Sequence, residues 1–283
     1  MTALGLEKDE ATLAYSTQKI KGEELSRVKE INLITALAGK AAGVQVNKNS
    51  SGMGGSAKIS LRGIRSAFGD NQPLYVIDGV PMSNTTSEQS YSAIGGTANA
   101  GNRDSGDGIS NLNPEDVESI SILKGAPAAA LYGSMAANGV ILITTKKGNS
   151  TGQRSIHFST GLTFDKAFSL PEMQNRYGVS DVTDSWGEKA NLEKHDNLND
   201  FFRTGLTSIT SVSVSYGNEN LQTYFSYANT TGKGIIDWNK LKKHNINLRE
   251  TATMFNKRLN WMATSNVMKP DGRRINLSQV VFI

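Results

Sequence analysis

From residue 155 onward, apolar residues alternate with small polar residues in at least five successive segments of about ten residues each. In the first segment, Ile156, Phe158, Leu162 and Phe164 share one alternation, and serine, histidine, glycine and threonine fill the other. This period of two predicts β-strands with one apolar and one polar face. Such segments are typical of transmembrane β-barrels, which turn the apolar face to lipid and the polar face to the lumen. Soluble β-sandwiches also alternate, so that alternative stays open.

The links between these segments differ in length. Residues 217–220 and 254–257 form short links, whereas residues 167–204 and 230–243 form long ones. Short turns at one end of a sheet and long loops at the other are typical of outer-membrane barrels. Residues 150–283 have room for five or six strands, whereas a plugged transporter barrel has about 22. We therefore expect an incomplete barrel.

The densest structural pattern before these strands spans residues 111–148. A β-prone run at 117–122 is followed by an alanine-rich segment in which Pro127 suits the first position of a short helix and Gly133 the position after its end. Residues 140–145 are apolar on both alternations, which predicts a strand buried on both faces. The block therefore predicts a βαβ-like unit, and none of its residues has the pattern of a catalytic group.

The N-terminal third adds one expected helix and several short strands. Residues 44–46, 58–62 and 73–77 are β-prone, and an Asp-Gly turn follows the last of them. Residues 83–110 are rich in serine, threonine, asparagine and glycine, which predicts a long loop that is either functional or mobile. Residues 23–38 carry an apolar residue at every third position, which predicts a helix. Its apolar stripe consists of Leu25, Val28, Ile31, Ile34 and Leu37.

Composition excludes several classes of function. The chain has 30 Lys and Arg residues against 26 Asp and Glu, a balance too even to indicate nucleic-acid binding. It has no cysteine, which excludes disulfides and thiolate metal sites. The first residues lack the pattern of a signal peptide, and no apolar run is long enough for a transmembrane helix. By themselves these features would suit a soluble protein.

Catalytic and ligand-binding motifs are absent or incomplete. Ser134 directly follows Gly133, but a nucleophile elbow needs glycines two positions before and two positions after the serine, and both are absent here. No phosphate-binding loop motif occurs. Residues 102–108 hint at a calcium loop, but the spacing is wrong and the distal glutamate is missing. We therefore expect no enzymatic activity, no cofactor and no metal site.

Four stretches together resemble the SusC/RagA-type TonB-dependent outer-membrane transporters. They are LAGKAAGVQV at 37–46, ISLRG at 59–63, PLYVIDGVPM at 73–82, and the long segment at 112–148, LNPEDVESISILKGAPAAALYGSMAANGVILITTKKG. The last is the most specific, and the resemblance covers nearly the whole chain.

The resemblance implies an α+β fold. Residues 1–149 would form a small mixed α/β plug domain, and residues 150–283 would form antiparallel strands of an incomplete outer-membrane barrel. It implies an importer of oligosaccharides or peptides that pairs with a SusD-like lipoprotein lid and takes energy from TonB. We expect the chain to be a fragment, without a TonB-contacting segment and not competent for transport alone. The alternative is a soluble two-part binding or adhesion module.

The resemblance also suggests two sets of functional residues. Two interpretations stay open for the charged residues of the plug motifs. They serve solubility and turn geometry, or some of them, Arg62 among them, pair with charges of the barrel wall and hold the plug reversibly. Aromatic residues in the polar loops 83–108 and 167–204 would contact substrate. The candidate plug–barrel contacts are Arg62, Arg65, Asp78, Glu115, Asp116 and Lys124. The candidate substrate contacts are Tyr91, Tyr177 and Trp186.

Overall fold

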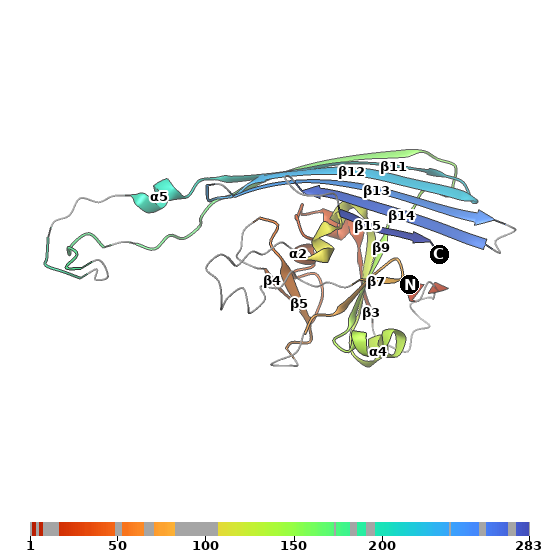
Figure 1. Cartoon of the computed structure of the whole chain (residues 1–283), viewed down its shortest axis with the longest axis horizontal. Coiled ribbons are helices and arrows are strands. Elements are labelled where there is room, and N and C mark those ends of the chain that lie inside the picture. Colours follow the sequence, from red (N-terminus) through yellow and green to blue (C-terminus); the bar gives the residue numbers. More distant parts are fainter. Residues whose placement is uncertain are drawn as a thin grey trace.

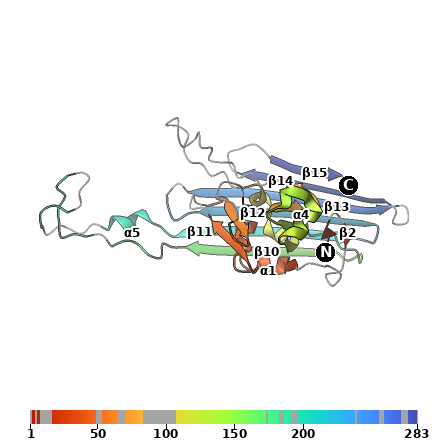
Figure 2. The same ribbon diagram turned by 90° about the horizontal axis from the view of Figure 1, so that it is seen from below.

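The computed structural model describes residues 2–3, 6–7, 17–48, 53–64, 71–82, 107–172, 174–181, 186–190, 196–237, 239–254, 259–270 and 276–282. Two sheets dominate the fold, a five-stranded sheet in an N-terminal domain and a six-stranded sheet that follows it. Figure 1 shows the six-stranded sheet as a long curved layer with the N-terminal domain beneath it. Figure 2, seen from below, places that domain over the middle of the layer.

The N-terminal domain is built from short elements. Its strands are β3 (Thr17–Lys21), β4 (Val44–Lys48), β5 (Ala57–Leu61), β6 (Leu74–Ile77), β7 (Val80–Met82), β8 (Val117–Leu123) and β9 (Val140–Thr145). Its helices are α1 (Gly22–Ser26), α2 (Leu33–Ala36), α4 (Ala126–Tyr132) and the 3₁₀ turns η2 (Gly108–Asn111), η3 (Pro114–Asp116) and η4 (Gly133–Ala136). Two short strands, β1 (Thr2–Ala3) and β2 (Leu6–Glu7), pair near the N-terminus.

Strand β9 is the centre of this domain. The strand order is β3-β8-β9-β6-β7, and β9 runs parallel to β6 and antiparallel to β8. Ile141 and Ile143 pack into one apolar cluster, whereas Val140 and Leu142 pack into a second. The expectation of a strand buried on both faces is therefore confirmed, because each alternation of β9 faces its own core.

Two details differ from the sequence prediction. The residues from 23 to 38 do not form one helix, because α1 ends at Ser26 and Asn32 starts α2 anew by accepting a hydrogen bond from the Ile34 N–H (2.9 Å). A period of three is too short for one helical face, and Val28 is left 59% exposed. The block 111–148 is not a βαβ unit either, since β8 and β9 are antiparallel. Helix α4 reverses the chain at one end of the sheet (Figure 1).

The six-stranded sheet, which we call the wall sheet, is a meander of sequential antiparallel neighbours. Its strands are β10 (Ser155–Asp165), β11 (Gly205–Gly217), β12 (Leu221–Lys233), β13 (Lys240–Met254), β14 (Leu259–Pro270) and β15 (Asn276–Phe282). Strands β12 and β13 run further than expected, so the link between them shrinks from 230–243 to residues 234–239. The long loop at 166–204 carries α5 (Asn197–Phe201) and extends well beyond the sheet (Figure 1).

The two faces of the wall sheet differ in chemistry. The inner face packs against the N-terminal domain and is mostly serine, threonine, asparagine and glycine on β11 to β13. The outer face carries the large apolar residues, as the alternation predicted. Its exposed members are Ile156, Phe158, Leu162, Phe164, Val214, Phe225, Ile246 and Leu248. No helix among the described residues is both long and apolar enough to cross a bilayer.

Candidate functional site at the interface between domain and wall

Strand β13 supplies most of the polar side chains that hold the N-terminal domain. Lys243, Asn245, Asn247 and Arg249 occupy alternate positions on its inner face, and each is less than 9% exposed. The residues between them face outward, and Ile246 is 41% exposed. A strand with this alternation presents a continuous row of donors to whatever lies inside it.

Arg249 makes the densest contact in this row. Its Nη1 lies 2.8 Å from the carbonyl oxygen of Thr145 and 3.1 Å from Oδ1 of Asp78, and it also donates to the Thr145 hydroxyl. Asp78 in turn accepts hydrogen bonds from the Thr145 N–H (2.9 Å) and hydroxyl (2.6 Å). One buried guanidinium therefore binds the last residue of the central strand β9 and the turn beside it.

The position of Asp78 follows from local sequence. Asp78 and Gly79 have φ angles of 49° and 90°, the left-handed pair that a tight two-residue hairpin needs between β6 and β7. Aspartate tolerates this conformation better than most residues because its short side chain bonds to nearby backbone. The turn thus holds the carboxylate at the edge of the domain that faces Arg249.

A second contact joins η3 to the neighbouring wall strand. The Tyr224 hydroxyl of β12 donates to Oδ1 of Asp116 (3.0 Å), whose side chain is almost fully buried. In the structure, Oδ2 of Asp116 has no hydrogen-bond partner. Burial raises the pKa of the Asp116 carboxyl above its ordinary value, and the nearby Ser226, Tyr224 and Lys146 only partly oppose this.

A third contact caps the 3₁₀ turn η2. Lys243 donates to the carbonyl oxygen of Ser110, and the Asn245 amide lies 2.6 Å from the carbonyl oxygen of Asn111. Carbonyls at the end of a helical turn lack internal partners and favour donors and positive charge. At the other end of η2, Asp107 accepts from the Ser110 N–H (2.8 Å) and from the Ala57 N–H (3.2 Å).

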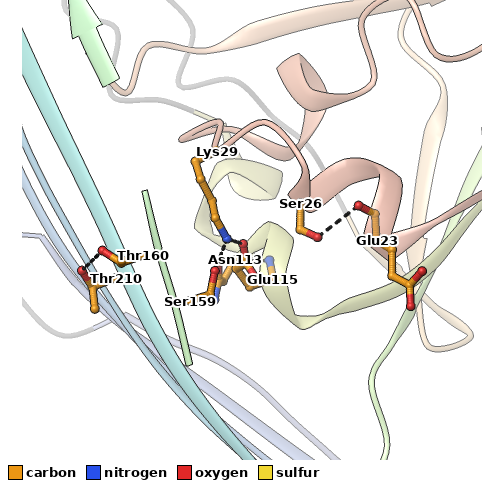
Figure 3. A network of polar contacts seen from close by, with 8 residues as sticks. All are labelled: Glu23, Ser26, Lys29, Asn113, Glu115, Ser159, Thr160 and Thr210. Atoms are coloured by element: carbon orange, nitrogen blue, oxygen red, sulfur yellow. Dashed lines mark hydrogen bonds and ion pairs between the residues drawn. The ribbon is translucent and has the colours of Figure 1, made fainter. Parts of the chain in front are cut away.

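A fourth contact reaches the first wall strand. Figure 3 shows the Lys29 ammonium between the Glu115 carboxylate and the Ser159 hydroxyl of β10. A Cβ atom at Gly161, on the same face of β10, would lie 2.4 Å from Cγ of Lys29. The small residue at 161 thus leaves room for the lysine stem that links the domain to this strand.

The backbones of the two parts approach each other closely where the chain passes from one to the other. A Cβ atom at Gly148 would lie 2.3 Å from the backbone nitrogen of Thr223 and 2.6 Å from its carbonyl oxygen. A polar pocket of about 540 Å³ lies nearby, and the residues that line it include Lys146, Lys147, His157 and Tyr224. Among the described residues, no group of three or more potential ligands is arranged to hold a metal ion.

The structure brings some of the predicted contact residues to the wall and not others. Asp78 and Asp116 bond directly to wall residues, and Glu115 reaches Ser159 only through Lys29. Arg65 lies outside the described residues.

Arg62 and Lys124 do not contact the wall in the described part of the chain. The Arg62 guanidinium lies beside Gly125, and Lys124 donates to the carbonyl oxygen of Ala42. Both contacts are internal to the N-terminal domain, near the start of α4, on the side away from the wall sheet (Figure 1). Among the described residues, the ion pair that joins the two parts has its arginine, Arg249, in the wall and its carboxylate, Asp78, in the domain.

Sequence reasoning missed the wall residues that do most of the binding. In the sequence, Asn245, Asn247 and Arg249 alternate with Ile246 and Leu248, which predicts that the two sets lie on opposite faces. This alternation gave no means of telling which of many polar positions would meet the domain. An arginine within a row of small polar residues was the one available signal.

The candidate substrate residues lie elsewhere. Tyr177 and Trp186 pack at 5.5 Å between ring centroids with a 53° tilt, in the long loop after β10. Backbone bonds from Gly178 N–H to the Glu188 carbonyl (2.8 Å) and from Gly187 N–H to the Gly178 carbonyl (2.7 Å) hold this pair together. Trp186 is 67% exposed. Tyr91 lies outside the described residues.

Comparison with known proteins gives a consistent result. The family described as the TonB-dependent Receptor Plug Domain matches residues 9–140. The TonB-dependent receptor SusC of Bacteroides thetaiotaomicron is 32% identical over 272 residues, which are 91% of this chain and 25% of SusC. The TonB-dependent receptor P26 of Formosa agariphila is 29% identical over 245 residues, 82% of this chain and 22% of P26. The chain spans about a quarter of the length of these curated relatives.

Solved structures share the same arrangement. The RagAB peptide importer in its closed-closed state superposes with a TM-score of 0.71 at 21% identity, over 95% of this chain and 32% of that chain. The ferric citrate transporter FecA in its unliganded form superposes with a TM-score of 0.57 at 12% identity, over 92% of this chain and 32% of that chain. At these identities the likeness establishes the fold, a mixed α/β plug followed by antiparallel strands.

Proposed function

Because this chain belongs to the TonB-dependent receptors of the SusC/RagA type, we propose that it supplies the plug and the first wall strands of an outer-membrane importer of oligosaccharides or peptides. In this proposal residues 1–149 form the plug and residues 150–283 form part of the barrel wall. The plug gates the lumen, and the role is not enzymatic.

The observation that carries the proposal is the contrast between the two faces of the wall sheet. The inner face holds the plug through polar contacts, of which Arg249 with Asp78 and Tyr224 with Asp116 are the most buried. The outer face exposes Phe158, Phe225 and other large apolar side chains. An apolar outside and a polar inside suit a wall between lipid and lumen.

The nature of the plug contacts also suits a gate. Lys243 and Asn245 bond to backbone carbonyls, and Lys29 bonds to a carboxylate and a hydroxyl. Such groups can exchange protein partners for water when the lumen is wet, because the net free energy of one hydrogen bond is about 0.5–1.5 kcal/mol. We propose that TonB supplies the work that displaces the plug, and that a SusD-like lipoprotein lid covers the extracellular end. Tyr177 and Trp186 would contact the substrate there.

A pair of single-cysteine variants tests the membrane assignment. The chain has no native cysteine, so Phe158→Cys and His157→Cys would each carry one fluorophore on adjacent residues of β10 that face opposite sides. In phospholipid vesicles, a lipid-dissolved nitroxide should quench the label at 158, and an aqueous quencher should quench the label at 157. Equal quenching of both labels by the aqueous agent alone would favour the alternative, a soluble two-part binding module.

A further inference from the structure

A cationic cluster lies on the outer face of the wall sheet, on strands β12 and β13, beside the exposed apolar residues Leu206 and Phe164. Lys233, Lys240 and Lys242 are exposed there, and His244 is the next outward residue along β13. Further along the same face comes Ile246, followed by Leu248 on β13. The cluster lies at the end of the sheet from which the loop carrying α5 departs (Figure 1).

The cluster is electrostatically unbalanced. Lys233 and Lys240 are directly opposite partners in the β12–β13 register, an arrangement in which like charges repel. Among the described residues, no ion pair includes any of the three lysines, and Asp237 in the adjoining turn is engaged by Arg203. The opposite end of the same outer face carries both signs of charge. Glu250 accepts a hydrogen bond from the Thr223 hydroxyl there (3.0 Å), and the Arg154 guanidinium lies 5.1 Å from the centroid of the Tyr216 ring.

His244 adds an oriented imidazole beside the lysines. Its Nδ1 lies 2.9 Å from the Tyr227 hydroxyl oxygen and 3.1 Å from the Asn229 amide nitrogen, and these contacts fix the orientation of the ring. The tyrosine and histidine rings lie nearly parallel, tilted by 21° with centroids 6.1 Å apart. Aromatic side chains at the edge of an apolar band are typical of the membrane–water interface.

We propose that Lys233, Lys240, Lys242 and His244 form a binding site for the phosphorylated headgroup of an outer-leaflet glycolipid whose acyl chains lie along the exposed apolar residues of the same face. The inference rests on the proposed membrane-spanning role of the wall sheet. A phosphate needs positive charge and N–H donors, and the cluster offers both. An acyl chain needs apolar surface, which the outer face offers at Leu206, opposite Lys233, and at Ile246 on β13. A phospholipid-like ligand uses both the cationic cluster and the apolar surface, whereas free phosphate uses only the cationic cluster.

Native mass spectrometry of the full chain in detergent tests the site. The chain would be titrated with diphosphorylated lipid A, with phosphatidylcholine, and with inorganic phosphate as a competitor. The test variant replaces Lys233, Lys240 and Lys242 by glutamine, and the matched control replaces the exposed Lys58, Lys147 and Lys189. A lysine near a membrane surface contributes about fivefold to anionic-lipid affinity, so the triple variant should bind lipid A about a hundredfold more weakly. The control should bind like the original chain.

Three outcomes would overturn the proposal. They are equal lipid A affinity in the test variant and the original chain, equal affinity for phosphatidylcholine, and displacement of lipid A by millimolar inorganic phosphate. The last would indicate a site for free phosphate. The cysteine-labelling experiment separates this failure from failure of the membrane role. A chain that inserts with residue 158 in lipid but shows no preference for lipid A refutes only the headgroup site.

Discussion

The guanidinium of Arg249 on wall strand β13 lies 3.1 Å from the carboxylate of Asp78 in the β6–β7 turn, and the two side chains are only 5% and 8% exposed. A buried pair is strongly destabilised when one partner is removed, because the other charge is left without compensation. The contact therefore links the docking of the plug to one turn of the plug and one residue of the wall.

We expect Arg249→Gln to lower the free energy of unfolding by about 3–5 kcal/mol, because it leaves Asp78 buried without its cation. In a double-mutant cycle with Asp78→Asn, measured by urea unfolding in detergent, the coupling energy should exceed about 1 kcal/mol. The exposed pair Arg203 and Asp237 provides the control cycle, in which coupling should stay below about 1 kcal/mol. Equal coupling in the two cycles would remove Arg249 from its proposed role.

Gly148 and Gly232 should respond differently to alanine. At Gly148 the new Cβ would meet the backbone of Thr223 at 2.3–2.6 Å, and backbone cannot move aside cheaply. At Gly232 it would meet the tip of the Met53 side chain at 2.2 Å, which is flexible. Gly148→Ala should therefore cost about 1–3 kcal/mol or more, the range for overpacked sites. Gly232→Ala should cost less, as thermal unfolding in detergent would show. A larger loss of stability for Gly232→Ala than for Gly148→Ala would mean that the backbones of Gly148 and Thr223 are not closely packed.

The pH dependence of stability should carry the signature of Asp116. Because the folded-state pKa is raised above the ordinary 3.8, the folded state binds more protons than the unfolded state between these two values. The contribution of Asp116 to stability is thus fully present below pH 3.8 and is lost as pH rises through the raised pKa. Asp116→Asn, which mimics the protonated acid, should flatten this part of the curve of melting temperature against pH. The exposed Glu188→Gln should not. An unchanged curve in Asp116→Asn would contradict the prediction.

Asp107 should prove structural. Its carboxylate starts η2 and also accepts from the buried Ala57 N–H and the Asn32 side-chain amide (3.5 Å), so Asp107→Ala removes the acceptor of three donors. We expect a loss of about 1–3 kcal/mol in the free energy of unfolding. Asp107→Asn, which keeps one carbonyl oxygen, should lose less. The exposed Asp196→Ala should change stability by under about 0.5 kcal/mol. Loss of calcium-dependent stability, rather than of stability itself, would instead support the calcium-loop alternative for residues 102–108.

Trp186 should matter for ligand binding and not for folding. Trp186→Ala removes the exposed half of the aromatic pair and should weaken oligosaccharide binding by about tenfold, if the loop contacts substrate as proposed. Calorimetric titration with mixed oligosaccharides and with peptides would measure this and distinguish the two substrate classes. Phe168→Ala, in the same loop and fully exposed, is the control. Equal affinity in the two variants would exclude Trp186 as a substrate contact.

Several features of the fold follow from neighbouring residues and could be predicted. The alternation after residue 155 predicted which face of β10 to β13 is apolar and which is polar, because successive side chains of a strand point to opposite sides whatever the strand packs against. The Asp78-Gly79 turn and the strand at Val140–Thr145 were likewise predicted, since turn geometry and burial on both faces leave local signals. The helix expected at 23–38 failed because an apolar period of three does not distinguish one helix from two short ones joined by a cap at Asn32.

The sequence by itself determined which residues could form strands, which face of each strand would be apolar, and which family the motifs indicate. Only the tertiary structure decided that Arg249 meets Asp78, that Lys29 joins Glu115 to Ser159, and that Arg62 stays within the plug. These pairings depend on how two separately formed sheets dock, with partners separated by up to 171 positions along the chain. Local sequence preferences do not predict these pairings. The inner face carries many polar residues that could bind the plug, and the packing of the two sheets decides which of them do.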